Sequence, residues 1–196
     1  PLGGLFFGVL GDKFGRQKVL AVTIIIMSVS TFSIGLIPSY ATIGIWAPIL
    51  LLIAKLAQGF SVGGEYTGAA IFVAEYAPDR KRGFLGSWLD FGSIAGFVLG
   101  AGVVVSITMI LGQERFEEWG WRIPFFIAGP LGILGMYLRS ALDETPTFQK
   151  HSEGVEKGSI KKQTLREVIK ENGRGILICI GLVITTNVTY YMLLTY

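Results

Sequence analysis

Residues 8–18 read Gly-Val-Leu-Gly-Asp-Lys-Phe-Gly-Arg-Gln-Lys, a polar segment between two apolar stretches. Glycine tolerates the backbone angles of a tight turn and lets helices approach closely. Asp12 can pair with Arg16 or with the N-terminal dipole of a neighbouring helix. The flanking residues 1–10 and 19–37 carry no charged side chain. This pattern is typical of a short charged turn between two membrane-spanning helices.

Long apolar stretches alternate with charged ones along the rest of the chain. The long stretches cover residues 19–37, 41–77, 91–113, 123–138 and 176–196. About 20 apolar helical residues are enough to cross a bilayer core. Charged residues make up 16% of the chain and the mean hydropathy is +0.57, whereas soluble domains carry about 25% charged residues. The sequence therefore predicts an all-α membrane protein with four or five spanning helices and the end of another in residues 1–10.

The basic residues predict the orientation of these helices. Most of the 17 lysines and arginines fall in residues 11–18, 78–83 and 139–174. Loops rich in lysine and arginine stay on the cytoplasmic side of a membrane, so we expect these three loops to be cytoplasmic. The predicted domains are a helical bundle over residues 1–139, a central cytoplasmic loop over 140–174 and the first helix of a second bundle over 175–196. Within the loop, residues 161–171 have the pattern of an amphipathic surface helix.

Residues 55–68 place polar groups on one side of an otherwise apolar helix. At 100° per residue, Gln58 and Glu65 lie within about 20° of each other, with Ser61 and Lys55 nearby. A charge at mid-membrane costs about 2.5–3.5 kcal/mol on insertion scales, so Lys55 and Glu65 should face a cavity, a partner or a substrate. They are about 15 Å apart along the axis, too far for a direct pair. A structural ion pair for Glu65 and outward snorkelling for Lys55 are the alternatives.

Asp90 is a further carboxylate within a predicted span, the helix expected over residues 84–111. A buried carboxylate titrates nearer neutrality than an exposed one, which suits a proton carrier; a structural pair with Lys55 or with another helix is the alternative. Tyr66 and Trp88 could offer aromatic faces to a quaternary ammonium, or could serve only in packing. The predicted substrate and proton path consists of Lys55, Gln58, Glu65, Tyr66, Trp88 and Asp90.

Glycines recur at four-residue spacing in two of the predicted helices. They are Gly59 and Gly63, Gly64 and Gly68, and the triplet Gly92, Gly96 and Gly100. Small residues at this spacing let helices approach closely within a membrane. The sequence therefore predicts close helix contacts along these faces.

Residues 8–18 resemble the signature loop of the major facilitator superfamily. Its pattern is Gly, three residues, Asp, a basic residue, one residue, Gly, Arg and further basic residues. The matching positions are Gly8, Asp12, Lys13, Gly15, Arg16 and Lys18, and Gln17 departs at a usually basic place. Residues 75–83 are similar to a Glu-x-x-Pro…Arg-Gly element of the sugar-porter and metabolite–proton symporter branches, with Glu75 and Arg82 as its charges. The resemblance implies that these segments form a cytoplasmic gate.

Over essentially its whole length the chain resembles the metabolite–proton symporter branch. This implies a twelve-helix fold in a bacterial inner membrane, of which the chain would hold the end of helix 2 through helix 7. Because both chain ends lie in apolar stretches, we also expect it to be part of a longer protein.

The resemblance implies alternating access driven by protons. The branch-level motifs do not choose a substrate, but Asp90 and the general likeness along the chain imply import of zwitterionic osmolytes such as proline and glycine betaine. A proton symporter for another metabolite, such as a dicarboxylate, and a transport-dead sensor on the same fold are the rival hypotheses.

The chain offers little for catalysis. An active site needs convergent reactive groups, and the sequence has one histidine, His151, in a polar loop and one cysteine, Cys179, in an apolar stretch. A single cysteine also gives no disulfide framework. We expect no enzyme activity, cofactor, metal or nucleic-acid partner. The expected partners are a small zwitterion, protons as the coupling ion and the lipid bilayer.

Overall fold

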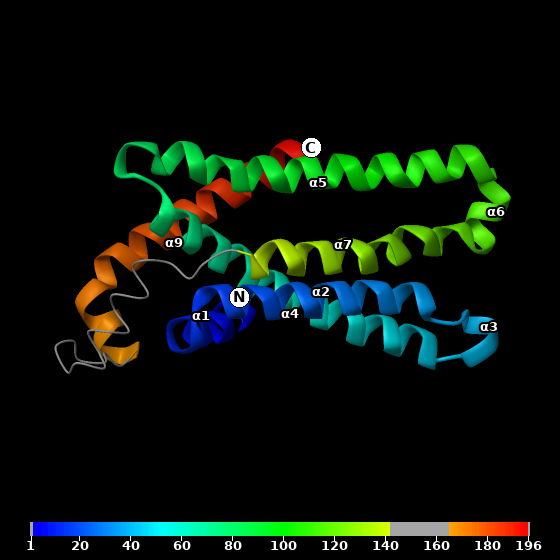
Figure 1. Ribbon diagram of the computed structural model, residues 1–196, viewed down its shortest axis with the longest axis horizontal. Coiled ribbons are helices and arrows are strands. Elements are labelled where there is room, and N and C mark those ends of the chain that lie inside the picture. Colours follow the sequence, from blue (N-terminus) through cyan, green and yellow to red (C-terminus); the bar gives the residue numbers. More distant parts are fainter. Residues whose placement is uncertain (1, 142–164, 196) are drawn as a thin grey trace. The chain divides into compact units, whose positions relative to one another are not determined.

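The structure is a computed structural model that describes residues 2–141 and 165–195, and the regular elements among these residues are all helical (Figure 1). The chain falls into two compact units, Pro1–Lys150 and His151–Tyr196. Five described segments are long and apolar enough to cross a membrane, which confirms the predicted all-α membrane protein. They are Arg16–Leu36, Trp46–Tyr76, Asp79–Leu111, Gly120–Ser140 and Lys170–Met192.

The first two helices meet at a one-residue corner. α1 (Leu2–Phe14) and α2 (Arg16–Leu36) are separated by Gly15 alone. Gly15 has a φ of 99°, where a side chain would be strained, and its N–H donates to the Gly11 carbonyl at 3.1 Å. Most of residues 11–18 are therefore helical, and the predicted loop is wrong in this respect. The corner brings the end of α1 next to the beginning of α2.

The remaining elements of the first unit follow the predicted spans closely. They are α3 (Tyr40–Ile43), α4 (Trp46–Tyr76), η1 (Asp79–Lys81), α5 (Arg82–Leu111), α6 (Gln113–Glu118), η2 (Gly120–Arg122) and α7 (Ile123–Ser140). α2 and α4 both stop shortly before a proline, Pro38 and Pro78, because proline cannot donate the backbone hydrogen bond that continues a helix. Gly44 and Gly112, at φ of 57° and 78°, turn the chain into α4 and α6.

α2 lies between α4 and α7, and α1 packs on α4 (Figure 1). The buried apolar side chains of α1, α2 and α4 are Phe7, Val19, Leu20, Ile34 and Ala54. A Cβ on Gly63 would lie 3.2 Å from the backbone nitrogen of Gly4, and a Cβ on Gly68 would lie 2.7 Å from Leu20. Together with Gly64, which abuts the Phe7 ring, these contacts confirm the predicted close approach along α4.

The other predicted glycine contacts are not made within the described residues. A Cβ on Gly59, Gly92, Gly96 or Gly100 would have no described atom within 4 Å. The three glycines of α5 lie on a helix that buries none of its residues. The four-residue spacing alone therefore did not show which of these glycines pack against a neighbouring helix among the described residues.

The second unit contains α9 (Leu165–Thr195), whose backbone leaves helical geometry at Asn172, with φ −110° and ψ 16°. Of the predicted surface helix over 161–171, residues 165–171 are helical and end at this break. Residues 161–164 lie outside the described residues, as does His151. Residues Lys170–Met192 are apolar enough to span a membrane, as predicted.

Candidate functional site

The polar stripe of α4, formed by Gln58, Ser61 and Glu65, faces the neighbouring helices α2 and α7. The Gln58 amide donates to the Thr31 hydroxyl at 2.6 Å, and the Ser61 hydroxyl donates to the Thr23 carbonyl. Ser61 and Thr23 are fully buried. Because a polar group in an apolar environment is costly without a partner, these bonds satisfy the stripe where it meets α2. The third member of the stripe, Glu65, reaches α7.

Glu65 forms an ion pair with Arg139, in the last turn of α7. The Arg139 guanidinium donates to a Glu65 carboxylate oxygen at 3.0 Å, and the two side chains are 20% and 27% exposed. The Gln17 amide donates to the carbonyls of Arg139 at 3.1 Å and Ser140 at 3.4 Å. One junction therefore joins the beginning of α2, the middle of α4 and the end of α7.

Sequence reasoning missed Arg139 as the partner of Glu65. Arg139 was used only as one of the basic residues that mark a cytoplasmic loop. The signal that could have found it is the need of an intramembrane carboxylate for a cation, combined with an arginine at the very end of a predicted span. The structural ion pair, which the sequence left open as an alternative, is the arrangement of Glu65 in this structure.

Lys55 and Tyr66 lie on another face of α4. They are within about 20° of each other around the helix, and about 60–80° away from Gln58. Both are exposed among the described residues. The Tyr66 hydroxyl donates to a carboxylate oxygen of Asp90 on α5 at 2.9 Å. Neither Lys55 nor Asp90 belongs to an ion pair within the part of the chain that the structure describes, so the alternative Lys55–Asp90 pair is not formed there.

Trp88 does not join this group. Its ring contacts Phe84 and Phe91 of the same helix, at centroid distances of 6.4 and 5.3 Å. Trp88 and Asp90 are two residues apart, which places them on nearly opposite sides of α5. The structure thus joins Tyr66 with Asp90 and leaves Trp88 in an aromatic cluster of α5. A role for Trp88 in the path stays a prediction.

A second charge cluster lies at the corner between α1 and α2. The Arg16 guanidinium is 2.9 Å from a carboxylate oxygen of Glu75, near the end of α4, and 3.6 Å from one of Asp12. The side chains of Arg16 and Glu75 are only 17% and 15% exposed. Arg16 therefore ties three helices together, and the predicted pairing of Asp12 with Arg16 is confirmed.

The other predicted gate residues are placed around this corner. Arg82 pairs with Asp79 at 3.0 Å, and both side chains are exposed, so the structure joins Glu75 to Arg16 and not to Arg82. Lys13 and Lys18 are exposed, and the Lys13 ammonium lies 5.1 Å from the centre of the Phe14 ring. Gly15 forms the corner.

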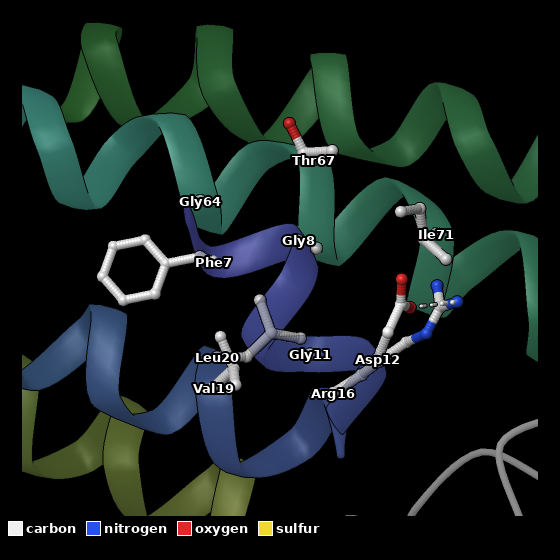
Figure 2. A pocket seen from close by; sticks show the side chains of 11 residues that line it. Phe7, Gly8, Gly11, Asp12, Arg16, Val19, Leu20, Gly64, Thr67 and Ile71 are labelled. Carbon is white, nitrogen blue, oxygen red and sulfur yellow. Dashed lines mark ion pairs between the residues drawn. The ribbon is translucent and has the colours of Figure 1, made fainter. Parts of the chain in front are cut away.

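A small cavity lies between α1, α2 and α4, beside this cluster of charges, and Gly8 is one of the residues that line it (Figure 2). Figure 2 shows Asp12 and Arg16 side by side toward one end and Phe7 toward the other. Its volume is about 30 Å³. That is room for water, which needs about 10–15 Å³, and far too little for an organic osmolyte. This cavity beside residues 8–18 is therefore too small to be a substrate site.

Replacing Gln17 with alanine is expected to loosen α7 from α2. The variant loses the amide that donates to two terminal carbonyls of α7, and a lost hydrogen bond costs about 1 kcal/mol. The measurement is the thermal stability of the membrane protein in detergent. Gln113→Ala is the matched control, because its amide reaches only the exposed Glu117 one turn away, a contact that contributes about 0.2–0.5 kcal/mol. Equal effects of the two variants would contradict the role of Gln17.

Comparison with known proteins places this arrangement in a family. The model of the family described as "Sugar (and other) transporter" matches residues 1–172. The chain belongs to this family. The match confirms the major facilitator resemblance drawn from residues 8–18 and 75–83, and makes the chain part of a multi-pass membrane transporter rather than an enzyme.

Two relatives and one solved structure agree with that assignment. The chain is 73% identical to a proline/betaine transporter of Salmonella typhimurium and 69% identical to a glycine betaine/proline/ectoine/pipecolic acid transporter of Dickeya dadantii. Each match covers 100% of this chain and 40% of the relative, so the chain spans about two fifths of their length. The fold is similar to the partially occluded inward-open xylose transporter XylE of E. coli, with a TM-score of 0.69, 22% identity, and 80% and 37% of the two chains covered.

Proposed function

We propose that the complete transporter carrying this segment imports zwitterionic osmolytes of the proline and glycine betaine type, driven by protons, across the bacterial inner membrane. The observation that carries this proposal is the identity of 69–73% along the whole segment to relatives with those substrates in their names. The stretch so matched includes the polar residues of α4 and α5. Loops 78–83 and 139–174, together with the α1–α2 corner, would face the cytoplasm by the positive-inside rule.

Lys55 is our candidate partner for the carboxylate of the substrate. It is exposed on α4 and forms no ion pair among the described residues. An uncompensated cation within a membrane helix is expected to face an aqueous path rather than lipid. A zwitterion that presents its carboxylate to Lys55 would supply the missing negative charge when it binds.

The charge cluster around Arg16 supports a role in gating. Interface ion pairs with two alternative arrangements are a common basis of switching between conformations, and midplane sites that open alternately to each side are typical of such transporters. We assign Gly8, Asp12, Lys13, Gly15, Arg16, Lys18, Glu75 and Arg82 to this gate. The Arg16 pairs with Asp12 and Glu75 would hold the cytoplasmic ends of α1, α2 and α4 together in one of the two conformations.

Gradient-driven uptake by the full-length transporter in proteoliposomes tests the proposal. We expect labelled proline and glycine betaine to accumulate when an inward proton gradient is imposed, and only to equilibrate without it. Lys55→Met should raise the KM for both solutes because the carboxylate loses its cation, whereas Lys55→Arg should keep a KM closer to that of the native protein.

Uptake of a dicarboxylate with neither zwitterion transported would overturn the substrate assignment and leave the fold assignment intact. Accumulation of proline that does not respond to the proton gradient would overturn the coupling. An unchanged KM in Lys55→Met would remove Lys55 from the binding site.

A further inference from the structure

Two carboxylates of the predicted path lie on adjacent helices and have different partners. Glu65 of α4 contacts the guanidinium of Arg139. Asp90 of α5 accepts a hydrogen bond from the hydroxyl of Tyr66. Glu65 therefore has a charged partner and Asp90 a neutral one. We expect the two carboxylates to have different roles in a proton-coupled cycle.

Glu65 contacts a charged partner at a site where both side chains are mostly buried. An arginine side chain stays protonated in proteins, and an opposite charge within about 4–6 Å favours the ionised form of a carboxylate. Protonating Glu65 would leave the Arg139 charge without a partner in a junction where both side chains are mostly buried, which is costly at low dielectric. The contact with Arg139 therefore gives Glu65 a structural role as the tie between α4 and α7.

Asp90 has no such cation among the residues that the structure describes. Of the elements packed on α5, α4 contributes the Tyr66 hydroxyl, and no basic side chain of η1, α6, η2 or α7 pairs with Asp90 within the described residues. Arg82, on the same helix, pairs with Asp79. A proton can therefore bind to Asp90 or leave it without breaking an ion pair among the described residues.

Asp90 also lies far from Lys55, the candidate partner for the carboxylate of the substrate. Lys55 and Tyr66 share a face of α4, but eleven residues of helix place them about 16 Å apart along its axis. Glu65 faces away from that side, toward α7. The Tyr66–Asp90 pair links α4 to α5 at the level of Tyr66, so a change at Asp90 acts directly on the contact between these two helices.

We infer that Asp90, with Tyr66 as its hydrogen-bond donor, is the proton-binding group of the transport cycle, and that Glu65 is a structural tie to Arg139. This inference rests on the proposed proton-coupled uptake. Asp90 takes up one proton from one side of the membrane and releases it to the other. Tyr66 keeps its own proton throughout and donates to the ionised form of Asp90, so protonation weakens the α4–α5 contact.

Two transport measurements on the full-length protein in proteoliposomes distinguish the roles. Counterflow exchanges labelled for unlabelled proline without a gradient, while accumulation requires an imposed proton gradient. Asp90→Asn should lose accumulation and keep a slower counterflow that no longer depends on pH. Glu65→Gln should reduce both activities in parallel and keep the pH dependence, because it disturbs the tie to Arg139 without removing the proton site.

Asp90→Glu and Tyr66→Phe extend the test. Asp90→Glu restores a titratable group and should recover part of the accumulation. Tyr66→Phe keeps the ring and removes the donor to the ionised carboxylate, so the pH profile of counterflow should move toward higher pH.

Each opposite result overturns the inference. Accumulation by Asp90→Asn would show that the proton binds elsewhere, and so would loss of coupling in Glu65→Gln alone. Loss of counterflow in Asp90→Asn, at normal membrane content, would make Asp90 necessary for translocation itself. Absence of proline counterflow in the native protein would instead refute the proposed function, which keeps the two failures distinct.

Discussion

Arg139→Ala is expected to destabilise the full-length transporter by about 1–3 kcal/mol, between the ranges for an exposed and a buried ion pair. The variant removes the cation that pairs with the Glu65 carboxylate, at a site where the two side chains are 20% and 27% exposed. It also cuts the link between α4 and α7. The measurement is thermal unfolding of the purified protein in detergent.

Two further variants show whether charge is the cause. Arg82→Ala also breaks an ion pair, but its side chain and that of Asp79 are 56% and 88% exposed, so the expected loss is within about 1 kcal/mol. The double variant Glu65→Leu with Arg139→Leu removes both charges and should recover most of the loss, since apolar replacement of a buried pair is often neutral. Equal losses in Arg139→Ala and Arg82→Ala would refute the buried tie.

Gly3→Ala is expected to separate α1 from α4. A Cβ at Gly3 would overlap the backbone carbonyl of Phe60, and the next glycine, Gly4, adjoins Gly63 of α4. A flexible side chain could move aside, but a helix backbone cannot do so locally. Overpacking of this kind costs about 1–3 kcal/mol, and we expect the upper end because the obstructing atom is backbone.

Gly59→Ala is the matched control for this prediction. Gly59 precedes Phe60 on α4, and a Cβ there meets no described atom within 4 Å. Alanine is a better helix former than glycine by up to about 1 kcal/mol, so this variant should be neutral or slightly stabilising. A loss of stability in Gly59→Ala equal to that in Gly3→Ala would show that the close α1–α4 contact is not the cause.

The membrane spans could be predicted from hydropathy because the bilayer gives the chain few choices. In hydrocarbon every backbone polar group must be bonded within the segment, so a long apolar stretch has to be a helix. The apolar stretches 41–77, 91–113 and 123–138 accordingly overlap α4, α5 and α7. The prediction was wrong for the loop at 11–18, because a single glycine with positive φ was enough to turn the chain.

The sequence by itself determined the all-helical membrane fold, the family and the positions of the intramembrane charges, because these depend on local composition and on spacing along one helix. Only the tertiary structure decided which side chains form hydrogen bonds and ion pairs with these polar residues. Periodicity placed Gln58 and Glu65 on one side of α4, but it could not say that this side meets α2 and α7, or that Arg139, 74 residues away, pairs with Glu65. Likewise Asp90 was joined to Tyr66 and not to Lys55. Hydrogen bonds and ion pairs act over a few ångströms, so their partners are set by which helices pack together.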